Sequence, residues 1–175
     1  MRIVIPTNRF LGTSLGTVDA LASTDLLALV AGTGAVITGG IYAAFPVMVL
    51  PAFDRLGAAR ATEVMRAINL AAERPGFLSL FFGTAAASVT AAASVILIAE
   101  AEAGKGMTWS VLAGSVLTAA AFALTLVVNV PMNRKLAATD DPAHAWASYR
   151  RRWGAANRLR AVMSIAGGVL LLAST

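Results

Sequence analysis

The chain has 175 residues, of which 58% are hydrophobic, and its mean hydropathy of +0.74 lies far above what one soluble core of this size needs. This composition predicts an integral membrane protein and excludes an ordinary soluble domain. With no cysteine, disulfides and thiolate metal sites are excluded, and a net charge of +5 would suggest a nucleic-acid partner only in a soluble chain.

The first 24 residues are predicted to form an arm outside the bilayer. Their apolar run is cut short by Pro6, which leaves it too brief for an ordinary signal peptide. Asp25 is expected to begin the first helix, because a carboxylate suits a helix N-terminus. The rest of the chain, residues 25–175, is predicted to be a single membrane domain.

The first predicted span is residues 26–50. This stretch carries no charge, and at about 1.5 Å per residue it can cross a hydrocarbon core of roughly 30 Å. Pro46 is expected to kink its last turn and Pro51 to end it. The pattern of Ala58–Glu73 then predicts a short amphipathic helix, which we expect at the cytoplasmic interface.

Three further spans are predicted at residues 77–99, 107–130 and 153–173. A tight outer turn, Glu100–Gly106, joins the second span to the third, and a polar loop, Thr139–His144, joins the third to the fourth. The fourth span has little apolar length, so Arg158 and Arg160 must snorkel or face inward. The predicted fold is therefore all-α, an integral membrane four-helix bundle with one extra interfacial amphipathic helix.

The positive charges predict how these spans are oriented. Most of them gather in two connections or at their edges: Arg55, Arg60, Arg66, Arg74, Arg134, Lys135, Arg150, Arg151, Arg152, Arg158 and Arg160. In a four-span protein these connections lie on one side, which the positive-inside rule makes cytoplasmic. We therefore predict a multi-pass protein of the cell membrane with both termini outside. The basic balance then needs no nucleic-acid partner.

One stripe of the last helix stands out. Placed on a helix, its polar and aromatic residues fall at steps of four and three: Trp146, Arg150, Trp153, Asn157, Arg160 and Ser164. In the predicted topology they meet the ends of the other spans, near Tyr42, Phe81 and Asn129. Polar groups at membrane depth are expensive and usually face a cavity or a partner. This convergence predicts a site.

Four motifs resemble a known family. They are GIYAAFPVMVLPAFDRL (Gly40–Leu56), ATEVMRAIN (Ala61–Asn69), NVPMN (Asn129–Asn133) and WGAANRLR (Trp153–Arg160). In this order they resemble the anthrone-oxygenase-like family of small membrane proteins, over Asp25 to the C-terminus. The resemblance implies oxidation of an anthrone to an anthraquinone without metal or flavin, so no cofactor is expected.

The resemblance also implies site residues. The family's motif positions match Asn69, Asn129, Pro131, Asn133, Trp153, Asn157 and Arg160. Two departures matter, because the family often has tryptophan and histidine where this chain has Ala156 and Arg158. If that histidine is the family's base, this protein lacks it.

Oxidation of an anthrone needs an aromatic slot, a base and donors for the developing oxyanion. We expect Trp153, Tyr42, Phe45 and Phe81, with Asn69 and Asn133, to bind the substrate. We expect Asn157, Asn129 and Arg160 to hold the oxyanion. Glu63 is the candidate base.

Each of these residues has a plainer interpretation. Trp153 is more often a membrane-interface anchor, Asn129 and Asn133 can cap a helix end, and Glu63 can pair with an arginine on the surface. His144 stands alone, whereas a transition-metal site needs three or more ligands, so no metal is predicted.

Two other functions stay open. A non-catalytic assembly subunit or binder of apolar ligands would use the same cavity, whereas a small transporter is disfavoured because no acidic residue lies inside a span. The expected partners are the lipid bilayer and a hydrophobic small molecule, with a homo-oligomer left open.

Overall fold

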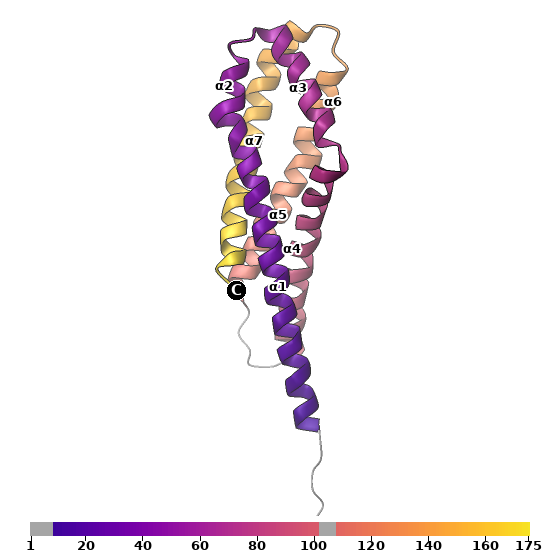
Figure 1. The fold of residues 1–175 in the computed structure, drawn as a ribbon, viewed down its shortest axis with the longest axis vertical. Helices are drawn as coiled ribbons and strands as arrows, with labels where there is room; N and C mark the ends of the chain where they lie inside the picture. Colours follow the sequence, from indigo (N-terminus) through magenta and orange to yellow (C-terminus); the bar gives the residue numbers. More distant parts are fainter. Residues whose placement is uncertain (1–8, 102–107) are drawn as a thin grey trace, which may run out of the picture.

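The computed structural model describes residues 9–101 and 108–175, with side chains described for 21–100 and 108–175. Residues 1–8 of the predicted arm and most of the predicted outer turn at Glu100–Gly106 lie outside this description. The described chain is helical and contains no strand. Figure 1 shows its long helices running side by side in an elongated bundle.

Four helical columns make up the bundle. The first consists of α1 (Arg9–Ala44), the π-helical turn η1 (Phe45–Val49) and α2 (Leu50–Phe53), and the second is α4 (Pro75–Ala101). The third consists of α5 (Trp109–Leu124), the π-helical turn η2 (Thr125–Asn129) and α6 (Val130–Ala137), and the fourth is α7 (Pro142–Leu172). Each column is long and apolar enough to cross a membrane. The protein is therefore a multi-pass membrane bundle, as predicted.

The amphipathic helix predicted between the first two spans is α3 (Ala58–Ala72). It buries Ala61, Thr62 and Met65 and packs against α6 and α7. Figure 1 shows it running along the bundle, so that it meets the start of α4 at a sharp break. The break falls at Glu73 and Arg74, just before Pro75.

Several helix ends differ from the predictions. Helix α7 begins at Pro142, inside the predicted polar loop Thr139–His144 and eleven residues before the predicted start of the fourth span. Helix α1 begins at Arg9, not at Asp25, because no proline interrupts the chain between Pro6 and Pro46. Pro51 does not end the first column, which continues to Phe53. The third column likewise continues past Pro131, six residues into α6.

The prolines are tolerated because each follows or occupies a π-helical turn. A proline ring clashes with the carbonyl four residues earlier, and the wider π turn relieves this crowding. Pro46 lies inside η1, and Pro131 comes two residues after η2. Both columns thus bulge where they would otherwise break.

Helix α7 lies against α1 and α5 through pairs of glycines. A Cβ added at Gly168 would lie 2.7 Å from the carbonyl oxygen of Gly32, and one at Gly114 would lie 2.7 Å from that of Gly167. Such small residues let helix backbones approach closely in a membrane. Around them an alanine-rich core forms at the end that holds the C-terminus: Ala28, Ala31, Ala87, Ala91, Val95, Val111 and Leu171.

A second, aromatic core lies at the other end: Leu50, Phe53, Ala61, Met65, Leu136, Trp146, Tyr149 and Trp153. Figure 1 shows that the connections from α2 to α4 and from α6 to α7 both lie at this end. The two arginine-rich connections therefore share one side of the bundle. That this side is cytoplasmic stays a prediction from the positive-inside rule.

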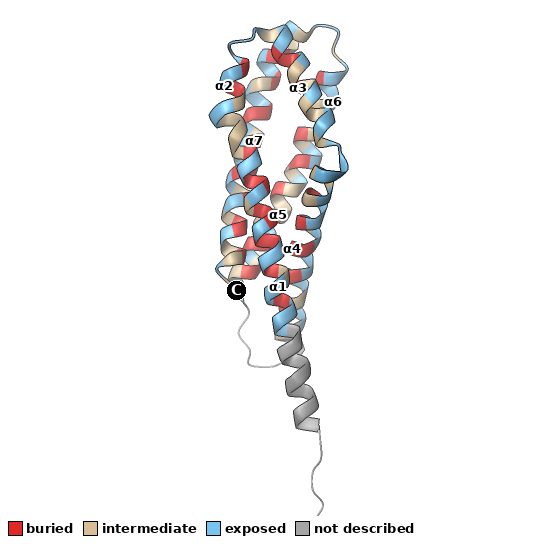
Figure 2. Cartoon of the chain, in the orientation of Figure 1, coloured by how far each residue is buried: buried red, intermediate tan, exposed pale blue. Residues whose placement is uncertain are grey.

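The outward faces of the columns are apolar. Val30, Val116 and Val162, on three different columns, are 52%, 66% and 64% exposed. Figure 2 shows such exposed positions along the outside of the bundle and the buried ones on the inward faces. Contiguous apolar exposure of this kind fits a surface that faces lipid.

Candidate functional site

A cavity of about 640 Å³ lies where the aromatic core meets the start of α4. Its walls come from α1 and η1, the second half of α3, the start of α4, η2 and α6, and α7. Eight of the residues predicted for the site line it: Tyr42, Phe45, Asn69, Phe81, Asn129, Asn133, Trp153 and Arg160. Residues from four distant segments thus meet around one space, which is within the usual size range of ligand pockets.

Aromatic rings form much of the wall. The rings of Phe81 and Phe122 stack with centroids 4.5 Å apart, and Phe77 lies nearly parallel to Phe81 at 6.1 Å. Across the cavity, Phe45 meets Trp153 edge to face at 5.0 Å. Flat apolar faces on two sides suit a planar aromatic ligand.

Asn157 lies behind this wall and does not line the cavity. It is fully buried, and its Nδ2 donates a hydrogen bond of 2.7 Å to the carbonyl oxygen of Tyr42. In a regular α-helix that oxygen would accept from residue 46, but Pro46 has no N–H to donate. The Asn157 amide therefore satisfies the carbonyl that Pro46 leaves free and ties α7 to α1.

Asn157 also holds Arg160. Its Oδ1 accepts from the Arg160 guanidinium at 2.7 Å, and the Thr125 hydroxyl accepts from the same group at 3.1 Å. The guanidinium carbon lies 4.1 Å from the centre of the Tyr42 ring and 5.7 Å from that of Trp153, within cation–π range. Hydrogen bonds and ring faces together fix the cation at the edge of the cavity.

Arg160 carries a buried charge with no ion-pair partner. Only 5% of the residue is exposed, and within the described ranges no carboxylate pairs with it. Its Nε has no hydrogen-bond partner there either. A buried cation is expensive inside a membrane unless something compensates it, so this one favours a ligand that brings negative charge or a strong acceptor.

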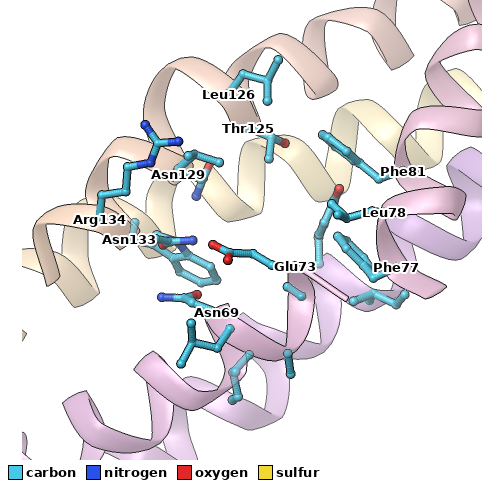
Figure 3. A pocket seen from close by; sticks show the side chains of 18 of the residues that line it. Asn69, Glu73, Phe77, Leu78, Phe81, Thr125, Leu126, Asn129, Asn133 and Arg134 are labelled. Carbon is cyan, nitrogen blue, oxygen red and sulfur yellow. The ribbon is translucent and has the colours of Figure 1, made fainter. Parts of the chain in front are cut away.

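Further polar atoms around the cavity lack protein partners. Asn129 is 1% exposed, yet neither its Nδ2 nor its Oδ1 is hydrogen-bonded within the described part of the chain. The same holds for Trp153 Nε1 and Asn69 Nδ2. Since buried polar groups are normally paired, these atoms are candidate contacts for polar atoms of a ligand. Figure 3 shows the Asn129 amide pointing into the cavity.

Hydrogen bonds hold α3 against the cavity. Arg66 donates to the carbonyls of Leu136 and Thr139 at 2.9 and 2.7 Å, and Thr62 donates to that of Pro142 at 3.0 Å. These bonds join α3 to the connection between α6 and α7. They set where the last turns of α3, with Asn69 and the following residues, face the cavity.

Asn133 is fixed from the same side. Its Oδ1 accepts a hydrogen bond of 2.9 Å from the Tyr149 hydroxyl. Asn129 and Asn133 share the cavity-facing side of the third column, because Pro131 does not break the helix between them. Both amides therefore reach the same space.

The expectation for Glu63 does not fit the geometry. Its side chain is 67% exposed, pairs with Arg60 at 2.6 Å and does not line the cavity. The surface ion pair, which was the plainer interpretation, is what the structure contains. Glu63 is therefore not positioned to act as a base on a ligand in this cavity.

Among the cavity residues that sequence reasoning missed, two polar ones bear on the chemistry of the site. Glu73 lines the cavity but was taken only as the last residue of the amphipathic helix. Its signal in the sequence was its place two residues before Pro75 and Gly76, where a new helix begins. Thr125 was also missed, although it lies four residues before Asn129 and so on the same helix face.

The two departures from the family pattern fall outside the cavity. Arg158 is exposed and Ala156 half-buried, and neither lines the cavity. These two positions therefore do not contribute to the lining of the cavity.

Metal-binding side chains do not gather at this site. In the parts of the chain that the structure describes, no three His, Cys, Asp or Glu residues come together as a ligand set. His144 is exposed near the start of α7, where its backbone N–H donates to the N-cap residue Asp141.

Comparison with known proteins identifies the family of this chain. No curated protein and no solved structure matches it. A family model described as anthrone oxygenase matches residues 77–170, which is more than half of the chain. The matched segment runs from the first residues of α4 almost to the end of α7 and includes Phe81, Asn129, Trp153 and Arg160. The chain therefore belongs to the anthrone oxygenase family.

Proposed function

We propose that this protein is an oxygenase that oxidises a hydrophobic, anthrone-like aromatic substrate at the cytoplasmic face of the membrane, without a prosthetic group. The observation that carries the proposal is the buried, unpaired Arg160 guanidinium at the edge of an aromatic cavity, inside the family segment. Such a site accepts a flat apolar ring system and favours negative charge on one of its oxygens.

The chemistry needs only the substrate and O₂. An anthrone loses a proton from its methylene carbon, and the electron pair moves into the ring system to give an enolate. The enolate passes one electron to O₂, and the resulting radical and superoxide combine to a carbon-bound peroxide. The peroxide takes up the first proton. Loss of the second methylene hydrogen as a proton then breaks the O–O bond, and the expelled hydroxide takes up this proton to leave as water beside the quinone. One O₂ is consumed, and one of its atoms ends in water.

The residues around the cavity support the first step. Arg160 and Asn129 offer hydrogen-bond donors to the enolate oxygen, and this charge forms as the proton leaves. Donors that are already in place cost little reorganisation and stabilise the transition state by a factor of about 10² to 10³ each. Asn157 acts through Arg160 and not on the substrate, so it is a positioning residue.

The border of the cavity suits a substrate dissolved in the bilayer. Ile41, Phe82 and Leu126 line the cavity and are also 40%, 51% and 43% exposed. They come from three different columns, so apolar surface leads from the outside of the bundle inward. A planar hydrocarbon can enter here without crossing water.

Purified protein in detergent or nanodiscs, given anthrone and air, tests the proposal. Quinone absorbance and O₂ uptake should both exceed the rate in buffer. An Arg160→Met change should lower this excess about 10²- to 10³-fold. Arg158→Met is the matched control, because Arg158 lies on the same helix, is exposed and does not line the cavity. Its rate should stay within about twofold of the original, as a distant surface change rarely exceeds half a kcal/mol.

Two results would count against an oxygenase. Equal rates of anthrone oxidation with and without protein would show that the protein does not catalyse this reaction for this substrate class. Binding of anthrone without faster oxidation would leave a ligand-binding membrane protein, the alternative that the same cavity allows.

A further inference from the structure

The carboxylate of Glu73 reaches the cavity from the wall opposite η2. Of the described residues that line the cavity, Glu73 is the single acidic one. It belongs to the short break between α3 and α4, so its position is set by Pro75 and by the bonds that hold α3 to the connection between α6 and α7. Figure 3 shows its carboxylate directed inward, toward Asn129 and Asn133.

The Glu73 carboxylate is not engaged by another described side chain. Within the described ranges it makes no ion pair and no side-chain hydrogen bond. Two other arginines line the cavity, but Arg66 is engaged with the carbonyls of Leu136 and Thr139, and Arg134 is exposed at the edge. Neither arginine forms an ion pair with the Glu73 carboxylate.

The cavity therefore has opposite polarity on two sides. Donors from Arg160 and Asn129 come from α7 and η2, and a carboxylate comes from the facing wall. An anthrone has a matching shape, because its carbonyl oxygen and its methylene carbon lie at opposite positions of the central ring. With the carbonyl oxygen on the donors, the methylene carbon points away from them, toward the carboxylate side.

From this arrangement we propose that Glu73 is the base that removes the methylene proton, an inference that rests on the proposed oxygenase function. The carboxylate takes the proton, the C–H electron pair moves into the ring system, and the enolate charge develops on the oxygen held by Arg160 and Asn129. After O₂ has added, the Glu73 carboxylic acid returns the first proton to the peroxide. The regenerated carboxylate then accepts the second methylene proton as the O–O bond breaks, and passes it to the expelled hydroxide, which leaves as water.

Proton transfer can be measured apart from oxidation. In D₂O buffer without O₂, the protein should exchange the methylene hydrogens of anthrone for deuterium faster than buffer does, which mass spectrometry follows. Glu73→Gln should lower both this exchange and quinone formation in air by about 10² or more, the usual contribution of a general base. Glu73→Asp should restore part of both rates.

Glu63→Gln is the matched control, because it removes a carboxylate of the same region that lies outside the cavity. Its rates should equal those of the original protein. Anthrone binding, followed by quenching of tryptophan fluorescence, should change less than twofold in Glu73→Gln, so that lost chemistry is separated from lost binding. Thermal unfolding should be unchanged, since the Glu73 side chain has no partner to lose.

The outcomes distinguish two failures. If the original protein both exchanges and oxidises anthrone and Glu73→Gln does so equally well, Glu73 is not the base, and the oxygenase function stands. If the original protein accelerates neither process, the oxygenase function fails and the role of Glu73 fails with it.

Discussion

At the end that holds the C-terminus, α1, α5 and α7 approach one another through glycines, whereas at the other end prolines and π-helical turns hold the columns apart around a cavity. The first end is packed through alanines and close glycine contacts. Among the described residues, the second carries eight aromatic side chains in stacked or edge-to-face contact. One end is closely packed, and the other encloses the cavity on which the proposed function depends.

The contrast rests on how the same helices are spaced. A membrane offers little hydrophobic drive between helices, so close packing through small residues must hold the bundle together. A cavity forfeits that packing. The glycine-packed end therefore has to stabilise the whole bundle, and the cavity end has to recover what it can through hydrogen bonds such as that of Asn157 to the Tyr42 carbonyl.

The largest effect is expected from filling a glycine contact. Gly114→Leu places a side chain where a Cβ already meets the Gly167 carbonyl at 2.7 Å, so α5 and α7 must separate. We expect a loss of about 3 kcal/mol or more in the free energy of unfolding, at the upper end of overpacking effects. The fraction of monodisperse protein and the thermal unfolding temperature measure it.

Gly83→Leu is the control for this change. A Cβ added at Gly83 meets nothing within 4 Å, so the same substitution faces open space. Its unfolding temperature should match that of the original protein. Equal loss at both positions would mean that the glycines serve the helices themselves and not their contact.

The second-largest effect tests the hydrogen bond from Asn157 on α7 to the Tyr42 carbonyl on α1. Asn157→Ala leaves the Tyr42 carbonyl buried and unpaired, which should lower the free energy of unfolding by about 1–3 kcal/mol. In a Pro46→Ala background residue 46 regains an N–H, so the same change should be less harmful. Unfolding of all four variants gives the coupling energy between the two sites. Additive losses would contradict the idea that the amide replaces the missing N–H.

Much of the fold could be predicted because its signals are local. Charge-free stretches of span length and clustered arginines are visible without any partner, and they predicted four spans and two connections on one side of the bundle. The stripe from Trp153 to Arg160 predicted which face of α7 turns inward, because a charged side chain within a span is costly in lipid and usually faces the bundle interior. Helix period and membrane energetics were enough for these features.

The remaining features depend on tertiary contacts. Whether Glu63 or Glu73 faces the cavity depends on where the chain breaks between α3 and α4, which residue periodicity cannot fix. Whether Pro51 and Pro131 end a helix depends on π turns that neighbouring helices support. The role of Asn157 as a substitute donor required knowing that it lies beside the Tyr42 carbonyl.

A smaller effect is expected from the aromatic wall. Phe81→Leu keeps an apolar side chain but removes the stacked contact with Phe122 and with a flat ligand. Aromatic pairs contribute about 0.5–1.5 kcal/mol beyond their buried area, so anthrone should bind roughly 2- to 10-fold more weakly. Titration of tryptophan fluorescence measures the dissociation constant. Trp109→Leu, at an exposed aromatic residue near the glycine-packed end, should leave it unchanged, and a similar loss there would point to a general effect of aromatic content.

The smallest effect on stability should come from the ion pair between Arg150 and Asp54, which lies on the outer surface at the cavity end of the bundle. The Arg150 guanidinium donates to both carboxylate oxygens of Asp54 and thereby joins α7 to the end of α2, but the two side chains are 35% and 44% exposed. Water screens such a pair, so Asp54→Asn should lower the free energy of unfolding by less than about 1 kcal/mol, and the loss should shrink further in high salt. Chemical unfolding at low and high ionic strength measures both values. A loss as large as that of Asn157→Ala would mean that the surface ion pair stabilises the cavity end as much as the buried Asn157 amide does.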